Sequence, residues 1–151
     1  MATTEATYRT ILLDCLAAVG ETLNAELVAD GLDPLVDWLP GEPLPIREDN
    51  TPYAWYTWAP YSGVPQPDLS SYVEHEVEFL VTLGLAGSDG GDLARKYSQY
   101  GPRIIAAVEN MACPYPLAVV AEGFIASPKQ PFALFPIGFV ANVTRNVGGL
   151  S

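Results

Sequence analysis

The clearest hydrophobic pattern in the sequence is a strict alternation from Tyr72 to Leu85. One set of alternate positions is apolar apart from a histidine, and it comprises Val73, His75, Val77, Phe79, Val81, Leu83 and Leu85. The other set comprises Tyr72, Glu74, Glu76, Glu78, Leu80, Thr82 and Gly84. A period of two places these sets on opposite faces, so the pattern predicts a strand with one buried face. At about 3.4 Å per residue the strand exceeds roughly 40 Å, so we expect it to bend or to project beyond the core.

Two other segments show helical spacing. Apolar side chains at Tyr8, Ile11, Leu12, Cys15, Leu16, Val19 and Leu23 predict a helix from about Thr4 to Leu23, with Gly20 weakening its end. A second set at Leu93, Tyr97, Tyr100, Ile104, Val108 and Met111 predicts a helix that runs to about Asn110. Asp89 or Asp92 can cap this helix, and Pro102 is expected to kink or restart it.

Three further segments are typical of strands. Tyr53–Ala59 is an aromatic strand bounded by prolines, and Leu117–Ala126 and Phe132–Thr144 are apolar stretches that can pair. Pro136 predicts an edge position or a bulge in the last of these, because proline cannot donate a ladder hydrogen bond. The order of elements predicts an α+β fold. We expect a mostly antiparallel sheet with two main helices packed on one face and a long central strand at 72–85.

The length of 151 residues suits a single domain spanning 1–151. Segment 40–52 is rich in proline and acidic residues, which predicts a loop or an extended arm. The end of the chain, 145–151, contains two adjacent glycines and is expected to be a flexible tail.

Charge narrows the possible functions. Eighteen acidic residues against seven basic ones give a net charge of -11, which argues against a surface that binds duplex DNA or an anionic membrane. Charged residues make up 17% of the chain, below the roughly 25% of typical domains, which favours an oligomer that hides part of its surface. No run of about 18 apolar residues predicts a membrane span, and the first residues do not resemble a secretory signal. We therefore expect the protein to be made in the cytoplasm.

The candidate chemical groups are few. His75 is expected to be a core or interface histidine, because the neighbouring glutamates point to the opposite face of its strand. A row of acidic side chains on the same strand is formed by Glu74, Glu76 and Glu78. This row can be a solvated strand face, the lining of a lumen or an interface, or a metal site. No second cluster of ligands in the sequence supports the metal site. Ser88–Asp92 resembles part of a calcium loop but lacks its closing glutamate, so a helix-capping turn is the preferred interpretation.

Cys15 and Cys113 lie far apart in the sequence, and no disulfide is expected. No catalytic, metal-binding or cofactor-binding motif occurs, so we expect no enzyme activity.

The densest aromatic group is Tyr53, Trp55, Tyr56 and Trp58. In a strand Tyr53 and Trp55 share one face, and Tyr56 and Trp58 share the other. The group can belong to the core, form a subunit interface, or act as a stacking platform for bases. The last alternative needs a basic groove, and only Arg47 lies nearby in the sequence.

The order of these elements resembles that of the tail terminator proteins of long-tailed bacteriophages. The resemblance is one of pattern, and it is carried by Tyr8–Leu23, Tyr53–Ala59, Tyr72–Leu85, Asp92–Asn110 and Phe132–Thr144. It implies a structural virion protein, assembled in the host cytoplasm, that forms a hexameric ring at the head–tail junction and caps the tail tube. The partners so implied are further copies of the chain and the neighbouring tail-tube and head-connector proteins, while DNA passes through the lumen.

Segment 40–52 and the Pro65–Pro67 loop depart from the terminator pattern, so another head–tail connector or a tail-tube component is an open alternative. Under the ring interpretation, Glu74, Glu76 and Glu78 would line the lumen and repel DNA, and Tyr53, Trp55, Tyr56 and Trp58 would lie in a subunit interface. A second alternative is a small α+β ligand-binding module, which would need an aromatic pocket around Trp55 and Trp58. An enzyme would need a second polar group converging on His75.

Overall fold

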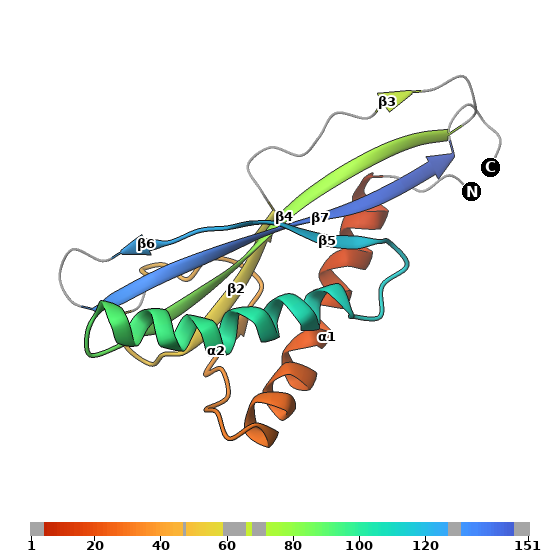
Figure 1. Cartoon of the computed structure of the whole chain (residues 1–151). Coiled ribbons are helices and arrows are strands. Elements are labelled where there is room, and N and C mark those ends of the chain that lie inside the picture. Colours follow the sequence, from red (N-terminus) through yellow and green to blue (C-terminus); the bar gives the residue numbers. More distant parts are fainter. Residues whose placement is uncertain (1–4, 47, 59–65, 68–71, 127–130, 147–151) are drawn as a thin grey trace.

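The computed structural model describes residues 5–46, 48–58, 66–67, 72–126 and 131–146. It shows two helices packed on one face of a mixed, mostly antiparallel sheet (Figure 1). The predicted α+β fold is therefore confirmed, including the long central strand.

The elements follow one another in the predicted order, with β1 and β3 as additional short strands and the predicted strand Leu117–Ala126 divided into β5 and β6. They are α1 (Glu5–Ala29), β1 (Trp38–Leu39), β2 (Tyr53–Trp58), β3 (Gln66–Pro67), β4 (Tyr72–Ala86), α2 (Gly90–Glu109), β5 (Leu117–Glu122), β6 (Ile125–Ala126) and β7 (Phe132–Asn146). The sheet has the order β1-β2-β4-β7-β5, with β3 beside β4 and β6 beside β7. The pair β1–β2 is parallel and the others are antiparallel.

Strands β4 and β7 form the spine of the sheet. Their register is unbroken from Tyr72 opposite Asn146 to Ala86 opposite Phe132, and the ribbon crosses the whole molecule (Figure 1). The apolar face of β4 is buried under the helices, as predicted, at Val77, Phe79, Val81, Leu83 and Leu85. The strand includes one residue more than predicted at its end, and the predicted tail contributes its first two residues to β7.

Of the two alternatives predicted for Pro136, the edge position is wrong, since β7 pairs with β4 on one side and with β5 and β6 on the other. The bulge in the β5–β7 pair lies between Val119 and Ala121 of β5. Pro136 lies opposite Thr82 in β4, and its carbonyl accepts a hydrogen bond from the Gly123 N–H at 2.8 Å. In antiparallel pairing the N–H and C=O of one residue point to the same neighbour, so the missing N–H of Pro136 faces β5 and β6. The outer strand is interrupted at this point, between Glu122 and Ile125, and the β4–β7 ladder is unaffected.

Helix α1 continues past Gly20 and past its predicted end at Leu23. Gly20 is required by packing, because a Cβ there would lie 2.9 Å from the Trp38 ring. The Trp38 indole N–H also donates to the Leu16 carbonyl at 2.7 Å, which ties β1 to the helix. The helix ends in a Schellman motif, in which Leu32 N–H bonds to the Leu27 carbonyl and Gly31, at a φ of 77°, supplies the left-handed residue.

Helix α2 is one continuous helix, so of the two alternatives expected at Pro102, a kink or a restart, the restart does not occur. Gly101 precedes the proline, and the absence of a Cβ there removes part of the clash that normally excludes helical geometry before proline. A larger residue at 101 would also meet the Tyr97 ring at 2.7 Å.

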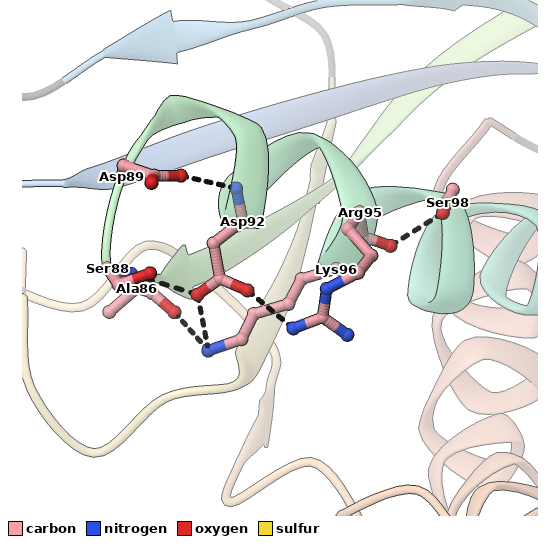
Figure 2. Close-up of polar contacts among 7 residues, drawn as sticks. All are labelled: Ala86, Ser88, Asp89, Asp92, Arg95, Lys96 and Ser98. Atoms are coloured by element: carbon pink, nitrogen blue, oxygen red, sulfur yellow. Dashed lines mark hydrogen bonds and ion pairs between the residues drawn. The ribbon is translucent and has the colours of Figure 1, made fainter.

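The start of α2 is fixed by two aspartates (Figure 2). Asp89 is the N-cap, and its carboxylate accepts from the Asp92 N–H at 2.8 Å. Asp92 in turn accepts from the Ser88 N–H at 2.9 Å and from the Arg95 guanidinium, and Lys96 lies 3.7 Å away. The Ser88 N–H, followed by Arg95, lowers the pKa of the Asp92 carboxyl below its ordinary 3.8. The two aspartates thus confirm the preferred interpretation of this segment as a helix-capping turn.

We expect Asp92→Asn to be less stable than the native chain at pH 6, with a difference that shrinks as the pH falls. A carboxyl whose pKa is lowered on folding stabilises the native state above its ordinary pKa of 3.8 and loses that contribution below it. Urea unfolding at a series of pH values from 6 to below 3 measures the difference. A difference that is constant across this range would contradict the assigned role of the charge.

The segment 40–52 is a closed loop and not a projecting arm. Both flanks of the segment are bound to one another, because the Val36 N–H bonds to the Pro52 carbonyl at 2.7 Å and the Ala54 N–H to the Asp37 carbonyl at 3.0 Å. Strands β1 and β2 continue this pairing in parallel, so the loop returns from the end of β1 to the start of β2. The connection between α1 and β1 forms no helix at Asp33–Pro34, where the Leu35 N–H bonds to the Asn24 side chain.

Candidate functional site

The face of the sheet opposite the helices carries a band of apolar side chains, which we call the open face. It comprises Leu80 of β4, Leu134, Pro136 and Val140 of β7, Ala118, Val120 and Ala121 of β5, and Ile125 of β6. Cross-strand pairing brings them together, because Leu80 lies opposite Gly138, and Gly138 lies opposite Ala121. A Cβ added at Gly138 would contact Ala121, Val120 and Leu80 at 3.5 to 3.7 Å, which confirms that these three share one face. The members of the band on β5 and β6 are exposed, whereas those on β4 and β7 are partly buried.

The open face reaches the outer edge of the sheet at β5 and β6, where its most exposed members lie. Val120 and Ile125 are 57% and 56% exposed, and Phe124 between them is 59% exposed. Val120 is the extra residue of a β-bulge between Val119 and Ala121, and the bulge turns its side chain toward Gly138. Phe124 turns to the other side and contacts Phe135 at a ring-centroid distance of 5.3 Å. The sequence predicts one apolar strand over Leu117–Ala126. The bulge is not predictable from it, because a bulge is defined by the pairing of a strand with its neighbour.

The predicted acidic row begins where the open face ends along β4. Glu76 and Glu78 are both exposed and lie on the same face as Leu80, opposite Asn142 and Val140 of β7. The backbone of Glu74 continues the strand, between Gln66 of β3 and Thr144 of β7. The side chains of Glu74 and His75 lie outside the described residues. The face of β4 therefore changes from acidic at Glu76 and Glu78 to apolar at Leu80.

The aromatic strand β2 is largely covered by the chain itself. Tyr53 and Trp55 stack at a centroid distance of 5.9 Å and form a small buried cluster with Phe132 on the side of the open face. Tyr56 is buried in the main core. The sequence left three alternatives for this aromatic group, namely the core, a subunit interface and a platform for stacked bases. The side chains of Tyr53, Trp55 and Tyr56 belong to the core, and in this conformation little of their surface is exposed for either of the other two roles.

Trp58, the fourth predicted interface residue, is only half-buried. It packs against Phe79 and carries the Arg9 guanidinium over its ring at 4.8 Å. Trp55 and Trp58 lie on opposite faces of the sheet. The two indoles therefore cannot line one pocket, which is what the ligand-binding alternative required.

Among the described residues, hollows are found on the helical side of the molecule. A groove of about 330 Å³ runs between α1 and α2, and its walls include Cys15, Val19, Ala107 and Met111. A second hollow of about 260 Å³ lies near the start of α2 and includes Arg95, Lys96 and Gln99. Lys96 in that hollow donates to the Ala86 carbonyl at 2.6 Å, so its charge is already engaged by the chain.

Two titratable side chains of α2, Tyr97 and Glu109, form hydrogen bonds to strand β5 of the sheet. The Tyr97 hydroxyl donates to the Glu122 carboxylate of β5, and burial together with this bond raises the pKa of Tyr97. Glu109 accepts from the Val119 N–H at 3.1 Å, which satisfies a backbone donor of the edge strand. Among the described residues, no group of three His, Cys, Asp or Glu side chains could hold a metal ion. Within the same residues, neither helix is both long and apolar enough to span a membrane.

Comparison of the sequence with protein-family models and with curated proteins gave no match. The assignment of a function therefore depends on the pattern of elements and on the geometry of the open face.

Proposed function

We propose that this chain is a structural subunit of a bacteriophage tail or neck, of the tail terminator type. In this proposal copies of the chain form a ring at the head–tail junction, cap the tail tube, and act by assembly without catalysis. The order of elements and the long β4–β7 ribbon support the proposal, because they match the pattern on which the resemblance to tail terminators rests.

The observation that carries the proposal is the open face. Contiguous apolar surface on a soluble domain marks an interaction site more often than not, and here it extends from Leu80 in the sheet centre to Ile125 at its edge. A ring subunit must offer its neighbours a surface of this kind, and the contact must be between two different patches for a ring to close. The face of the sheet that the helices cover is less suited to such a contact, since its apolar side chains are already buried between the sheet and the helices.

The acidic row supports a ring that encloses DNA. Glu76 and Glu78 are exposed beside the open face, and the whole chain carries a net charge of -11. A lumen of this sign repels phosphates, so that DNA passes without binding. In an assembled ring these two side chains should face the central hole, and Glu74 should extend the row.

A head–tail connector or tail-tube subunit would use the same open face and acidic row. The partner distinguishes these alternatives, because a terminator binds the end of a tail tube, a connector binds the portal side, and a tube subunit stacks on copies of itself.

We expect the purified chain to form closed rings with a central hole, either alone or on addition of its tail-tube partner. Light scattering gives the mass of the oligomer, and electron microscopy shows its shape. The double variant Val120→Asp, Ile125→Asp should abolish the rings, because burying two charges in an apolar contact is strongly unfavourable. Circular dichroism of the variant verifies that the monomer remains folded, since both side chains are exposed in the single chain.

Val36→Asp is the matched control. Val36 is 53% exposed and lies on the connection between α1 and β1, away from β5 and β6, so this variant should assemble normally. A chain that stays monomeric with and without tail proteins would overturn the proposal. Rings in which Glu76 and Glu78 face outward would retain assembly but contradict the lumen role of the acidic row.

A further inference from the structure

The two cysteines, far apart in sequence, meet in the fold. Cys15 lies on α1 and lines the groove between the helices, whose opposite wall includes Met111 and Ala112. Cys113 follows directly on the connection from α2 to β5 and packs against the same core. The two thiols are close enough to hydrogen-bond to one another, and both are free and half-buried. No disulfide is expected from the sequence, whereas the fold places the two thiols close to one another.

We propose that Cys15 and Cys113 are an oxidisable dithiol, which closes to an intramolecular disulfide and ties α1 to the α2–β5 connection. Cys113 is partly exposed on the connection from α2 to β5, where a small disulfide can reach it, and the nearby Cys15 thiol gives the second step of disulfide exchange a short path. This inference is independent of the proposed function, because it concerns only the folded chain.

The reaction with a small disulfide such as oxidised glutathione proceeds in two exchanges. The Cys113 thiolate attacks one sulfur of glutathione disulfide, forms a mixed disulfide, and releases the first glutathione thiolate, which takes up a proton. The Cys15 thiolate then attacks the Cys113 sulfur, forms the protein disulfide, and releases the second glutathione. In sum, two cysteine thiols are oxidised and one glutathione disulfide is reduced to two glutathione molecules.

The surroundings of Cys15 determine the pH at which the bond closes. Burial, and next the neighbouring Cys113, raise the pKa of the Cys15 thiol to about 11. A thiol with a raised pKa is mostly protonated at neutral pH and is a poor nucleophile there. Closure should therefore be slow at pH 7 and accelerate about tenfold for each pH unit up to about 10, in proportion to the thiolate fraction.

The experiment treats the folded native chain with oxidised glutathione at pH 7 and at pH 9 and follows its intact mass. We expect the single glutathione adduct to accumulate at pH 7 and to give way at pH 9 to a monomer that has lost two hydrogens. Peptide mapping should then show Cys15 joined to Cys113. The oxidised monomer should unfold at a higher urea concentration than the reduced one, because the cross-link restricts the unfolded chain.

The variants Cys15→Ala and Cys113→Ala separate the two steps. Cys15→Ala should keep its glutathione adduct at pH 9, and Cys113→Ala should form adduct more slowly than the native chain at pH 7. Adducts on both cysteines of the native chain at pH 9, without a protein disulfide, would overturn the proposal. So would a disulfide that forms only between two chains or only in urea.

Discussion

Replacing Phe139 with alanine is expected to destabilise the folded chain by about 3–5 kcal/mol, the usual cost of removing a fully buried aromatic ring. Phe139 is completely buried in the middle of β7, and its ring stacks on Phe79 of β4 at a centroid distance of 5.4 Å. The pair lies under both helices, so the cavity left by the ring cannot be filled by solvent or by a surface side chain. A loss of this size is a large part of the roughly 5–15 kcal/mol of typical domain stability.

Phe124→Ala provides the matched control for this loss. Phe124 lies between the outer strands β5 and β6 and is mostly exposed, so its removal should cost less than about 1 kcal/mol in the monomer. Urea unfolding of both variants, followed by tryptophan fluorescence at low protein concentration, compares them directly. Equal costs for the two substitutions would show that β7 does not run through the core as described.

The second large effect is expected from a single methyl group at Gly84. A Cβ at this position would lie 2.8 Å from two ring carbons of Tyr53, and the Tyr53 ring is fully buried and stacked on Trp55. The ring cannot move aside without disturbing that buried cluster. We therefore expect Gly84→Ala to destabilise the chain by about 1–3 kcal/mol, as overpacking of a closed site does. Thermal unfolding measures the change.

Gly138→Ala tests whether the effect at Gly84 comes from the contact or from the loss of a strand glycine. Gly138 lies in the adjacent strand on the same face, and a Cβ there would meet its neighbours at 3.5 Å or more. This variant should be neutral or more stable by up to about 1 kcal/mol, because alanine restricts the unfolded chain more than glycine does. Combining Gly84→Ala with Tyr53→Leu should recover part of the loss, and an absence of coupling between the two would contradict the overpacking explanation.

Periodicity was sufficient to predict the main elements of this fold. The alternation around Phe79 located β4 and its buried face, and the spacing from Leu12 to Leu23 located α1. The errors occurred where a distant partner decides the local structure. Gly20 was interpreted as a weak end of α1, although the Trp38 ring is what requires a glycine there. Strand β1 has two residues and is defined only by its pairing with β2, so no local pattern could reveal it.

The candidate surface was only partly predictable for the same reason. The exposed acidic positions Glu76 and Glu78 follow from alternation within a single strand. The apolar band beside them depends on the register of β5 and β7, in particular on the bulge at Val120 that turns this side chain onto the open face. Contact between Cys15 and Cys113 likewise depends on how α1 crosses the end of α2, which a single sequence does not specify.

Loop 40–52 is expected to tolerate the insertion of additional residues. Because the pairing of β1 with β2 fixes both ends of the loop, residues added between them change the free energy of loop closure mainly through chain entropy, by about 0.6 kcal/mol for each doubling of the loop. Leu44 within the loop is 87% exposed, so added residues there would displace nothing from the core. This loop is therefore the natural place for a fluorescent label or an affinity tag, which would mark each subunit without changing the open face through which the subunits are proposed to assemble.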